Sequence, residues 1–241
     1  MLTDVLSAAS PEAFGRSMRI THCVRHLIGK FNLPSPWRFE TAAMLSQLGC
    51  VTLDLGVMQA AFVGKRLSAE DQAQFATHPQ AARDLLVHIP RMEPIAWMIG
   101  QQLTKGPLED APDMSAPYSE SIVLGAMILK LAVAFDNLKM KGLTDEEALA
   151  RLRFRCDELG PELVAALADF KSESATMQLR KVPASRLTMG MILQQEIRTR
   201  AGTLMVPKGQ EITPALLIKL VNFSQAGSID SEIVVLVPAN L

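Results

Sequence analysis

The chain has few aromatic residues, and its charges nearly cancel. Aromatic residues make up 5% of the 241 residues, with a single Tyr and two Trp, so a stacking platform for single-stranded nucleic acid is not expected. The formal net charge of −1 gives no electrostatic reason to expect binding to nucleic acid or to an anionic membrane. We therefore expect neither a nucleic-acid partner nor insertion into a membrane.

Cysteine is scarce, and there is no obvious targeting segment. Three cysteines lie far apart and form no CxxC pair, which favours a reduced compartment: Cys23, Cys50 and Cys156. Residues 1–10 contain Asp4 and lack a basic start, so a signal peptide is not expected. The longest apolar stretch, 122–135, is interrupted by Gly125 and Lys130 and is predicted to be too short for a bilayer. These features predict a cytoplasmic protein.

Gly-rich phosphate loops and the GxSxG nucleophile motif are absent as well. In contrast, the hydrophobic fraction is 49% and the charged fraction 20%, which excludes global disorder and allows a sizeable core. The length suits one medium domain together with a small one.

Capping residues and apolar spacing predict an all-helical region up to about Phe170. Ser10-Pro11 is a strong helix start, because Ser caps free backbone N–H groups and Pro fits the first turn. Further starts are expected at Ser68, Thr144, and Gly160-Pro161. The predicted helices cover residues 11–31, 37–48, 58–63, 68–77, 80–88, 93–103, 119–138, 144–156 and 161–170. The second of these helices is expected to break at Gly49 into an extended exit.

The character of the sequence changes after Lys171. Residues 172–179 are polar and are predicted to be a linker, and residues 180–241 are predicted to form a small β-rich α+β domain. Strands are expected within 191–199, 203–206 and 232–237, and a helix from Thr213-Pro214 to about Phe223. The predicted fold class is therefore mainly α: a helical bundle over residues 1–171, followed by the small domain.

Few residues suggest chemistry by themselves. His22 and His26 are four residues apart on one predicted helix and could bind a metal ion together. The same helix face also carries the basic residues Arg19, Arg25 and Lys30, so a solvated basic face is favoured instead. His78 is expected to make a local hydrogen bond, and Cys50 to be an inert buried thiol. Asp136, inside an apolar helix, needs a partner, and a helix-terminus or cross-helix hydrogen bond is expected.

Five segments, in this order and spacing, carry a resemblance to a known family: 16–20, 42–53, 67–86 with His78-Pro79, 89–96 and 125–136. Together, residues of about 12–170 resemble the HD-GYP family, the HD-superfamily phosphodiesterases that hydrolyse cyclic di-GMP and often serve as outputs of response regulators. The resemblance implies an HD-type helical bundle and a metal site built from His and carboxylate side chains.

The chain departs from this family at most of the implied ligand positions. The first His of the family falls on Arg16, its His-Asp pair on Ser46 and Gln47, its paired histidines on Gln101 and Gln102, and its last acidic ligand on Val133, three residues before Asp136. Of the implied ligand set only His78 is present. In addition, Cys50 replaces a lysine, Leu103 replaces a glutamate, and residues 104–117 replace the GYP loop.

These departures predict that the chain holds no metal or other cofactor. Ser, Gln and Val lack the charge and basic lone pairs of a binuclear iron or manganese site. Arg16 would add a fixed positive charge, and two unit charges about 4 Å apart repel by about 4 kcal/mol at an effective dielectric constant of about 20. The resemblance then implies a catalytically inactive, HD-GYP-like output or adaptor acting through protein contacts in two-component or cyclic di-GMP signalling. Its expected partners are a receiver domain, a histidine kinase system or a second copy of the chain.

Two alternatives stay open. One is a metal-free receptor for cyclic di-GMP or a related nucleotide, bound by Arg16, Arg19, Gln101 and Gln102. The other is a residual cyclic di-GMP phosphodiesterase. Residues of about 180–237 resemble a small module that follows degenerate HD domains in some response regulators, a resemblance that implies no activity and rests on three segments: 187–193, 202–204 and 208–210.

Overall fold

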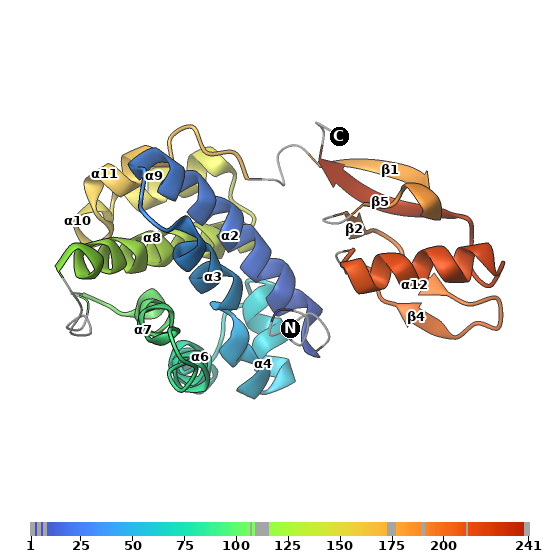
Figure 1. Cartoon of the computed structure of the whole chain (residues 1–241), viewed down its shortest axis with the longest axis horizontal. Helices are drawn as coiled ribbons and strands as arrows, with labels where there is room; N and C mark the ends of the chain where they lie inside the picture. The colour runs from blue at the N-terminus through green and yellow to red at the C-terminus, as the bar shows by residue number, and fades with distance from the viewer. Residues whose placement is uncertain are drawn as a thin grey trace. The chain divides into compact units, whose positions relative to one another are not determined.

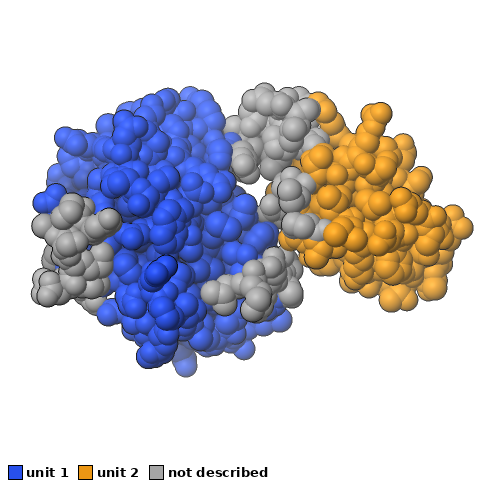
Figure 2. All heavy atoms as spheres, in the orientation of Figure 1, with its two compact units in different colours: residues 1–172 blue, residues 173–241 orange. Residues whose placement is uncertain are grey.

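The computed structural model describes residues 3, 6, 9–106, 108, 116–172, 177–188, 191–210 and 212–238. The chain forms two compact units, residues 1–172 and residues 173–241, which Figure 2 shows in blue and orange. The described part of the first unit is helical, and the second unit combines short strands with one long helix. The predicted fold class, mainly α with a small α+β tail, is confirmed.

In its described residues, the first unit is built from α-helices and two short 3-10 helices (Figure 1). In chain order these are α2 (Pro11–Phe31), α3 (Pro36–Leu45), η1 (Leu48–Thr52), α4 (Leu55–Phe62), α5 (Ala69–Phe75), α6 (His78–Leu86), α7 (Glu93–Gly100), η2 (Gln101–Leu103), α8 (Ala116–Met140), α9 (Asp145–Arg153), α10 (Cys156–Leu159) and α11 (Pro161–Ala166).

The predicted helix starts are confirmed by their caps. The Ser10 hydroxyl accepts a hydrogen bond from the Ala13 amide at 3.2 Å, with Pro11 in the first turn. Ser68 caps α5 in the same way. Thr144 and Glu147 form a reciprocal capping box at the start of α9. These local bonds satisfy backbone groups that a helix end leaves free, which is why the sequence alone marked the starts correctly.

Helix α8 is the centre of the core. It packs against α2, α3, α7 and α9, and Figure 1 shows it crossing the unit beside α2. It is longer than the predicted 119–138. By length and composition alone its segment Glu120–Met140 could span a membrane, contrary to the expectation that this stretch is too short, yet 61% of the segment's most apolar window is buried inside the protein. Such burial is typical of the core helix of a globular domain.

The prediction for the second helix was wrong at its end. The helix stops at Leu45, and residues Leu48–Thr52 form the 3-10 helix η1 rather than an extended exit. A Cβ atom at Gly49 would lie 1.9 Å from the carbonyl oxygen of His78 and 2.8 Å from the amide nitrogen of Ala82. Gly49 therefore lets the backbone of η1 touch the start of α6, which no local sequence pattern reveals.

Other helix boundaries differ by a few residues. The helix expected over 93–103 ends at Gly100 and tightens into η2, and the helix expected over 144–156 is divided into α9 and α10. A tighter last turn satisfies carbonyl groups at a helix end, so such changes are common there.

The second unit contains β1 (Met177–Pro183), the 3-10 helix η4 (Ala184–Arg186), β2 (Ile192–Leu193), β3 (Ile197–Arg198), β4 (Leu204–Val206), α12 (Pro214–Gln225) and β5 (Glu232–Pro238). One antiparallel sheet has the order β1-β5-β2, with Met177 opposite Pro238 and Pro183 opposite Glu232. Strands β3 and β4 form a separate hairpin. A small core lies between these strands and α12, with Leu193, Leu220 and Val235 fully buried.

One prediction for this region needs correction. Strand β1 begins at Met177, inside the stretch 172–179 that was expected to be a linker. The stretch 191–199 contains strands, as expected, but two of them: β2 pairs with β5 whereas β3 pairs with β4, so the chain must bend between them. Met189 and Gly190, which carried part of the resemblance in this unit, lie outside the described residues.

Candidate functional site

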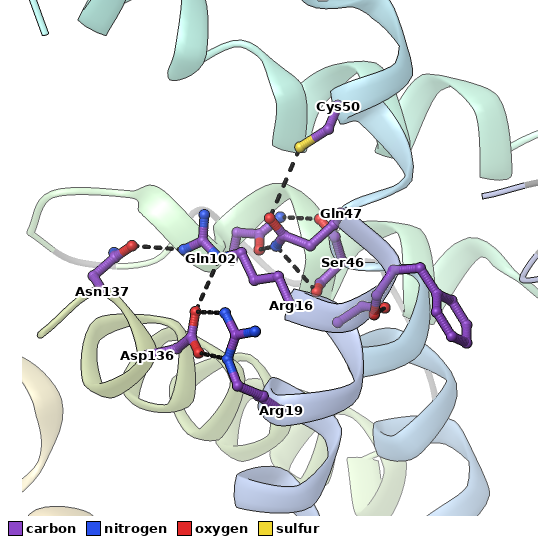
Figure 3. A network of polar contacts seen from close by, with 10 residues as sticks. Arg16, Arg19, Ser46, Gln47, Cys50, Gln102, Asp136 and Asn137 are labelled. Atoms are coloured by element: carbon purple, nitrogen blue, oxygen red, sulfur yellow. Dashed lines mark hydrogen bonds and ion pairs between the residues drawn. The ribbon is translucent and has the colours of Figure 1, made fainter. Parts of the chain in front are cut away.

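Helix α2 brings two arginines to Asp136, a buried acidic residue of α8. The Nε atom of Arg16 donates to Asp136 Oδ2 at 3.1 Å, and the Nε atom of Arg19 donates to Asp136 Oδ1 at 2.8 Å. The Nη2 atom of Arg16 also donates to Asn137 Oδ1 at 2.6 Å. Figure 3 shows the Asp136 carboxylate between the two guanidinium groups. The expected partner of Asp136 is thus found, and it lies across helices.

Arg16 is buried almost completely, with 1% of its surface exposed. Its guanidinium carbon lies 5.3 Å from the ring centroid of Phe62 and 5.9 Å from that of Phe75, a cation–π geometry. Burial lowers the pKa of Arg16, and the negative charge of Asp136 opposes that effect. Because arginine keeps its proton in proteins, the interior of the domain contains a permanent positive charge that one carboxylate neutralises.

A second group of polar side chains comes from α3, η1 and η2. The Gln47 amide donates to Ser46 Oγ at 3.2 Å and to Gln102 Oε1 at 3.4 Å. The Gln102 amide donates to the Ser46 carbonyl at 2.9 Å, and the thiol of Cys50 lies 3.8 Å from Gln47 Oε1. Ser46, Gln47 and Gln102 are all buried, and Figure 3 shows them in one network. These neutral groups satisfy one another.

The two groups are close enough to interact. The positive charge of Arg16 tends to lower the pKa of the Cys50 thiol, but burial dominates and raises that pKa to about 12. Cys50 therefore keeps its proton at neutral pH, as expected of an inert buried thiol.

His78, at the first turn of α6, makes the local hydrogen bond that its position suggested. Its Nδ1 atom lies 2.6 Å from the Phe75 carbonyl oxygen, so Nδ1 carries the proton and donates. The imidazole also lies against the Phe75 ring, with centroids 4.7 Å apart. Burial lowers the pKa of His78 to about 4, and the charge of Arg16 adds to that effect. The side chain is therefore neutral at pH 7.

Gln101 and Val133 complete the set of predicted positions. Gln101 is buried in η2 and accepts a hydrogen bond from the Thr104 hydroxyl at 3.3 Å. Val133 is buried in α8 and, with Gln102 and Asn137, forms part of the wall of a pocket of about 550 Å³. Within residues 104–117, the stretch that replaces the GYP loop, positions 107 and 109–115 lie outside the described residues.

The sequence matches the profile of HD domains over residues 1–163, which covers more than half of the chain and most of the helical unit. The chain belongs to the HD domain family. No curated protein and no solved structure matches it. Membership of the HD family supports a relation to phosphohydrolase-type signalling proteins.

HD domains of the phosphohydrolase type imply a metal site, and the donor set of this HD domain does not fit one. Among the described residues, no three His, Cys, Asp or Glu side chains come together at a spacing that could hold a metal ion. His78 offers one neutral nitrogen, Nε2, which has no described hydrogen-bond partner. The carboxylate of Asp136 is engaged by Arg16 and Arg19. A dication here would face one imidazole and a buried guanidinium.

The residues expected to contact a nucleotide are poorly placed to do so in this HD domain. Arg16, Gln101 and Gln102 each have 1% of their surface exposed. Only Arg19 is accessible, with 42% of its side chain exposed, and it is already paired with Asp136. A ligand that reached all four residues would have to enter the packed interior.

Sequence reasoning missed Asn137, Phe62 and Phe75, which surround the Arg16 guanidinium. Asn137 could have been found, because it follows Asp136 directly in the same buried segment. The two rings could not, since their contact with Arg16 depends on how α4 and α5 fold back onto α2.

The prediction for His22 and His26 also needs correction. Both rings pack against Phe170, each with centroids 5.2 Å apart, and the Nε2 atom of His26 lies 3.0 Å from the Ala166 carbonyl oxygen. This face of α2 therefore packs against the end of the helical unit instead of facing solvent throughout. Arg25 and Lys30 on the same helix are exposed, as expected.

Proposed function

We propose that this HD domain is catalytically inactive and HD-GYP-like, and that it serves as a signalling output or adaptor. It would act through contacts with other proteins in two-component or cyclic di-GMP signalling, with a receiver domain or a histidine kinase system as partner. The single observation that carries the proposal is the buried Arg16–Asp136 ion pair, in which Arg16 stands where the resemblance to the HD-GYP family implies the first metal ligand.

The packing of the site supports this proposal. A retained but idle active site would leave polar groups facing an open cavity, whereas Ser46, Gln47 and Gln102 bond to one another and are buried. Buried polar groups need partners, and these three side chains provide them for one another. The three replacements therefore act together as part of the core.

Exposed apolar side chains support a role in protein contacts. Leu55 and Val63, at the two ends of α4, are 61% and 68% exposed. Leu85 and Val87, at the end of α6, are 51% and 38% exposed, and α6 packs against η1, which directly precedes α4. A contiguous exposed apolar patch marks a surface that binds a partner, and we propose that these four side chains form such a patch.

Metal content and turnover test the absence of catalysis. Elemental analysis of the purified full chain is expected to give far less than one iron, manganese or zinc atom per chain, and the protein is expected not to hydrolyse cyclic di-GMP. Stoichiometric metal, with turnover lost in His78→Ala, would overturn the proposal and establish the residual phosphodiesterase instead. His88→Ala is the matched control, because His88 is exposed and lies outside the site.

Binding to isolated receiver domains tests the adaptor role. Receiver domains from the source organism are produced individually and titrated against the immobilised full chain. At least one is expected to bind with micromolar affinity and to lose that affinity in the double variant Leu55→Glu/Val63→Glu. Phe154→Glu is the control. Phe154 is 89% exposed, but it lines the pocket of about 550 Å³ and does not belong to α4. If none of the receiver domains binds, or if Leu55→Glu/Val63→Glu leaves the affinity unchanged, the apolar residues at the ends of α4 do not form the binding surface for a receiver domain.

A further inference from the structure

The pocket of about 550 Å³ lies beside the former metal site but is lined by different chemistry. Its walls come from η2, the second half of α8, α9 and α10. It adjoins the buried polar groups described above, because Gln102 and Asn137 belong to both. Its volume lies within the range of about 300–1,000 Å³ that is usual for small-molecule sites.

The lining of this pocket is strongly cationic. The pocket is lined by one carboxylate, Glu158, and by five Lys or Arg side chains: Lys105, Lys130, Lys141, Arg151 and Arg155. The lining therefore has an excess of four positive charges, although the net charge of the whole chain is −1. Cations gathered around a concave surface focus a positive potential and attract anions.

Two of the five cations are already paired. Lys130 lies 3.3 Å from Glu158 Oε1 and donates to the Gly106 carbonyl at 3.2 Å. Arg155 donates to Glu158 Oε2 through Nε and Nη2, at 3.2 and 2.8 Å. A single carboxylate thus serves both cations.

The other three cations form no ion pair with a described carboxylate. Lys105, Lys141 and Arg151 are exposed. Lys105 follows η2, Lys141 follows α8, and Arg151 lies in α9. Like charges directed at one concavity repel one another, so their arrangement favours an anion that bridges them.

An aromatic ring completes the pocket. Phe154 follows α9, lines the pocket and has 89% of its surface exposed, the largest exposure among the exposed large apolar side chains. An exposed ring beside a group of cations can stack against a base, an interaction that every nucleobase offers.

We infer that this pocket binds a nucleotide, with the phosphates held by Lys105, Lys141 and Arg151 and the base placed against Phe154. The inference does not depend on the proposed loss of catalysis, because none of these four residues belongs to the former metal site. It moves the receptor function from the buried residues Arg16, Gln101 and Gln102 to an open surface.

Calorimetric titration of the full chain tests the inference. The probes are inorganic pyrophosphate, ADP, cyclic di-GMP and, as an uncharged control, adenosine. Pyrophosphate and ADP are expected to bind, ADP several-fold more tightly, and adenosine is expected not to bind below 1 mM. The affinity for pyrophosphate is expected to fall steeply with added salt, because charge pairing supplies most of it. No binding of pyrophosphate, ADP or cyclic di-GMP at 1 mM would overturn the inference.

Arg151→Gln and Arg153→Gln form a matched pair. Both arginines are exposed on α9, but only Arg151 lines the pocket. The affinity for pyrophosphate is expected to fall about tenfold in Arg151→Gln, the loss of one charge-assisted contact, and to stay within about twofold in Arg153→Gln. Equal effects of the two substitutions would place the anion elsewhere and overturn the assignment.

Phe154→Ala separates a nucleotide site from a simple anion site. The substitution is expected to weaken ADP several-fold and to leave pyrophosphate unchanged, since only ADP has a base. A wild-type affinity for ADP that does not exceed that for pyrophosphate, with no effect of Phe154→Ala, would overturn the nucleotide assignment. Retention of the circular dichroism spectrum in each variant excludes unfolding as the cause.

Discussion

Two neighbouring regions of the helical domain collect positive charge in opposite ways. Around Arg16 the charge is buried, held by Asp136 and Asn137 and covered by two aromatic rings. In the pocket beyond Asn137, three exposed cations form no ion pair with a described carboxylate. The first region pairs its cation with a buried carboxylate, although Arg16 Nη1 has no described hydrogen-bond partner, whereas the second region keeps its cations at the surface.

The difference shows where each region could act. A buried guanidinium is tolerated only with a partner, because an unpaired charge in the interior costs several kcal/mol. Exposed lysines and arginines cost little when unpaired, because water solvates them. The buried Arg16 guanidinium therefore belongs to the packing of this domain, whereas the exposed cations of the pocket can bind an anionic ligand.

Removing the buried partner should have the largest effect. Asp136→Asn leaves the Arg16 guanidinium uncompensated in the interior, and we expect the free energy of unfolding to fall by about 3–5 kcal/mol. Urea denaturation followed by circular dichroism measures this loss. Asp169→Asn, which breaks the exposed ion pair with Lys30, is the control and should leave the midpoint nearly unchanged. Equal midpoints for both variants would mean that the buried pair has no special role.

Acid should weaken the buried region through His78. Its pKa is about 4 in the folded protein and near 6.5 in the unfolded chain, so the unfolded chain binds the extra proton first as the pH falls. The contribution of the neutral imidazole is complete above pH 6.5 and is lost as the pH falls from 6.5 to 4. The shift corresponds to about 3 kcal/mol.

Denaturation at several pH values measures this dependence, with His78→Asn as the comparison because its amide can still donate to the Phe75 carbonyl. The variant is expected to show a shallower decline between pH 6.5 and 4. Parallel declines would assign the acid sensitivity to other groups.

Removing the buried cation itself should cost much less than removing its partner. In Arg16→Met, Asp136 keeps both hydrogen bonds from Arg19, at 2.8 and 3.4 Å, and the half-buried Asn137 can turn to water. We expect a loss of about 1 kcal/mol, well below that of Asp136→Asn. The two variants measured side by side test this asymmetry, and a larger loss for Arg16→Met would reverse it.

Neutralising a pocket cation should have the smallest effect on stability. Arg151→Gln removes an exposed charge with no ion pair among the described residues, so the unfolding free energy should stay within about 0.5 kcal/mol of wild type. Thermal unfolding without ligand checks this value. A clear loss of stability would show that Arg151 supports the fold, contrary to the contrast between the two regions.

Local chemistry made part of this fold predictable. The starts at Ser10, Ser68 and Thr144 depend on hydrogen bonds within four residues, so the sequence identifies them directly. The need of Asp136 for a partner was also foreseen, since an acidic residue in an apolar helix must be compensated. The resemblance to the HD-GYP family also predicted that Ser46, Gln47 and Gln102 lie close together, and they form one hydrogen-bond network.

Contacts between distant segments account for what the sequence did not reveal. Arg16 and Asp136 are 120 residues apart, and no sequence pattern around either residue indicates that they pair. The division of 191–199 into two strands depends on their partners β4 and β5. The cationic pocket combines residues from four elements, so its charge excess is hidden by a net charge close to neutral.

The glycine at position 49 has a mechanical consequence. The backbone of Gly49 lies directly against the backbone of His78 and Ala82. At this point, therefore, no side chain separates η1 from α6. Side chains can absorb a small displacement by changing rotamer, whereas two backbones in contact cannot. At this contact, a displacement of η1 would therefore have to move the backbone of His78 and the start of α6 with it.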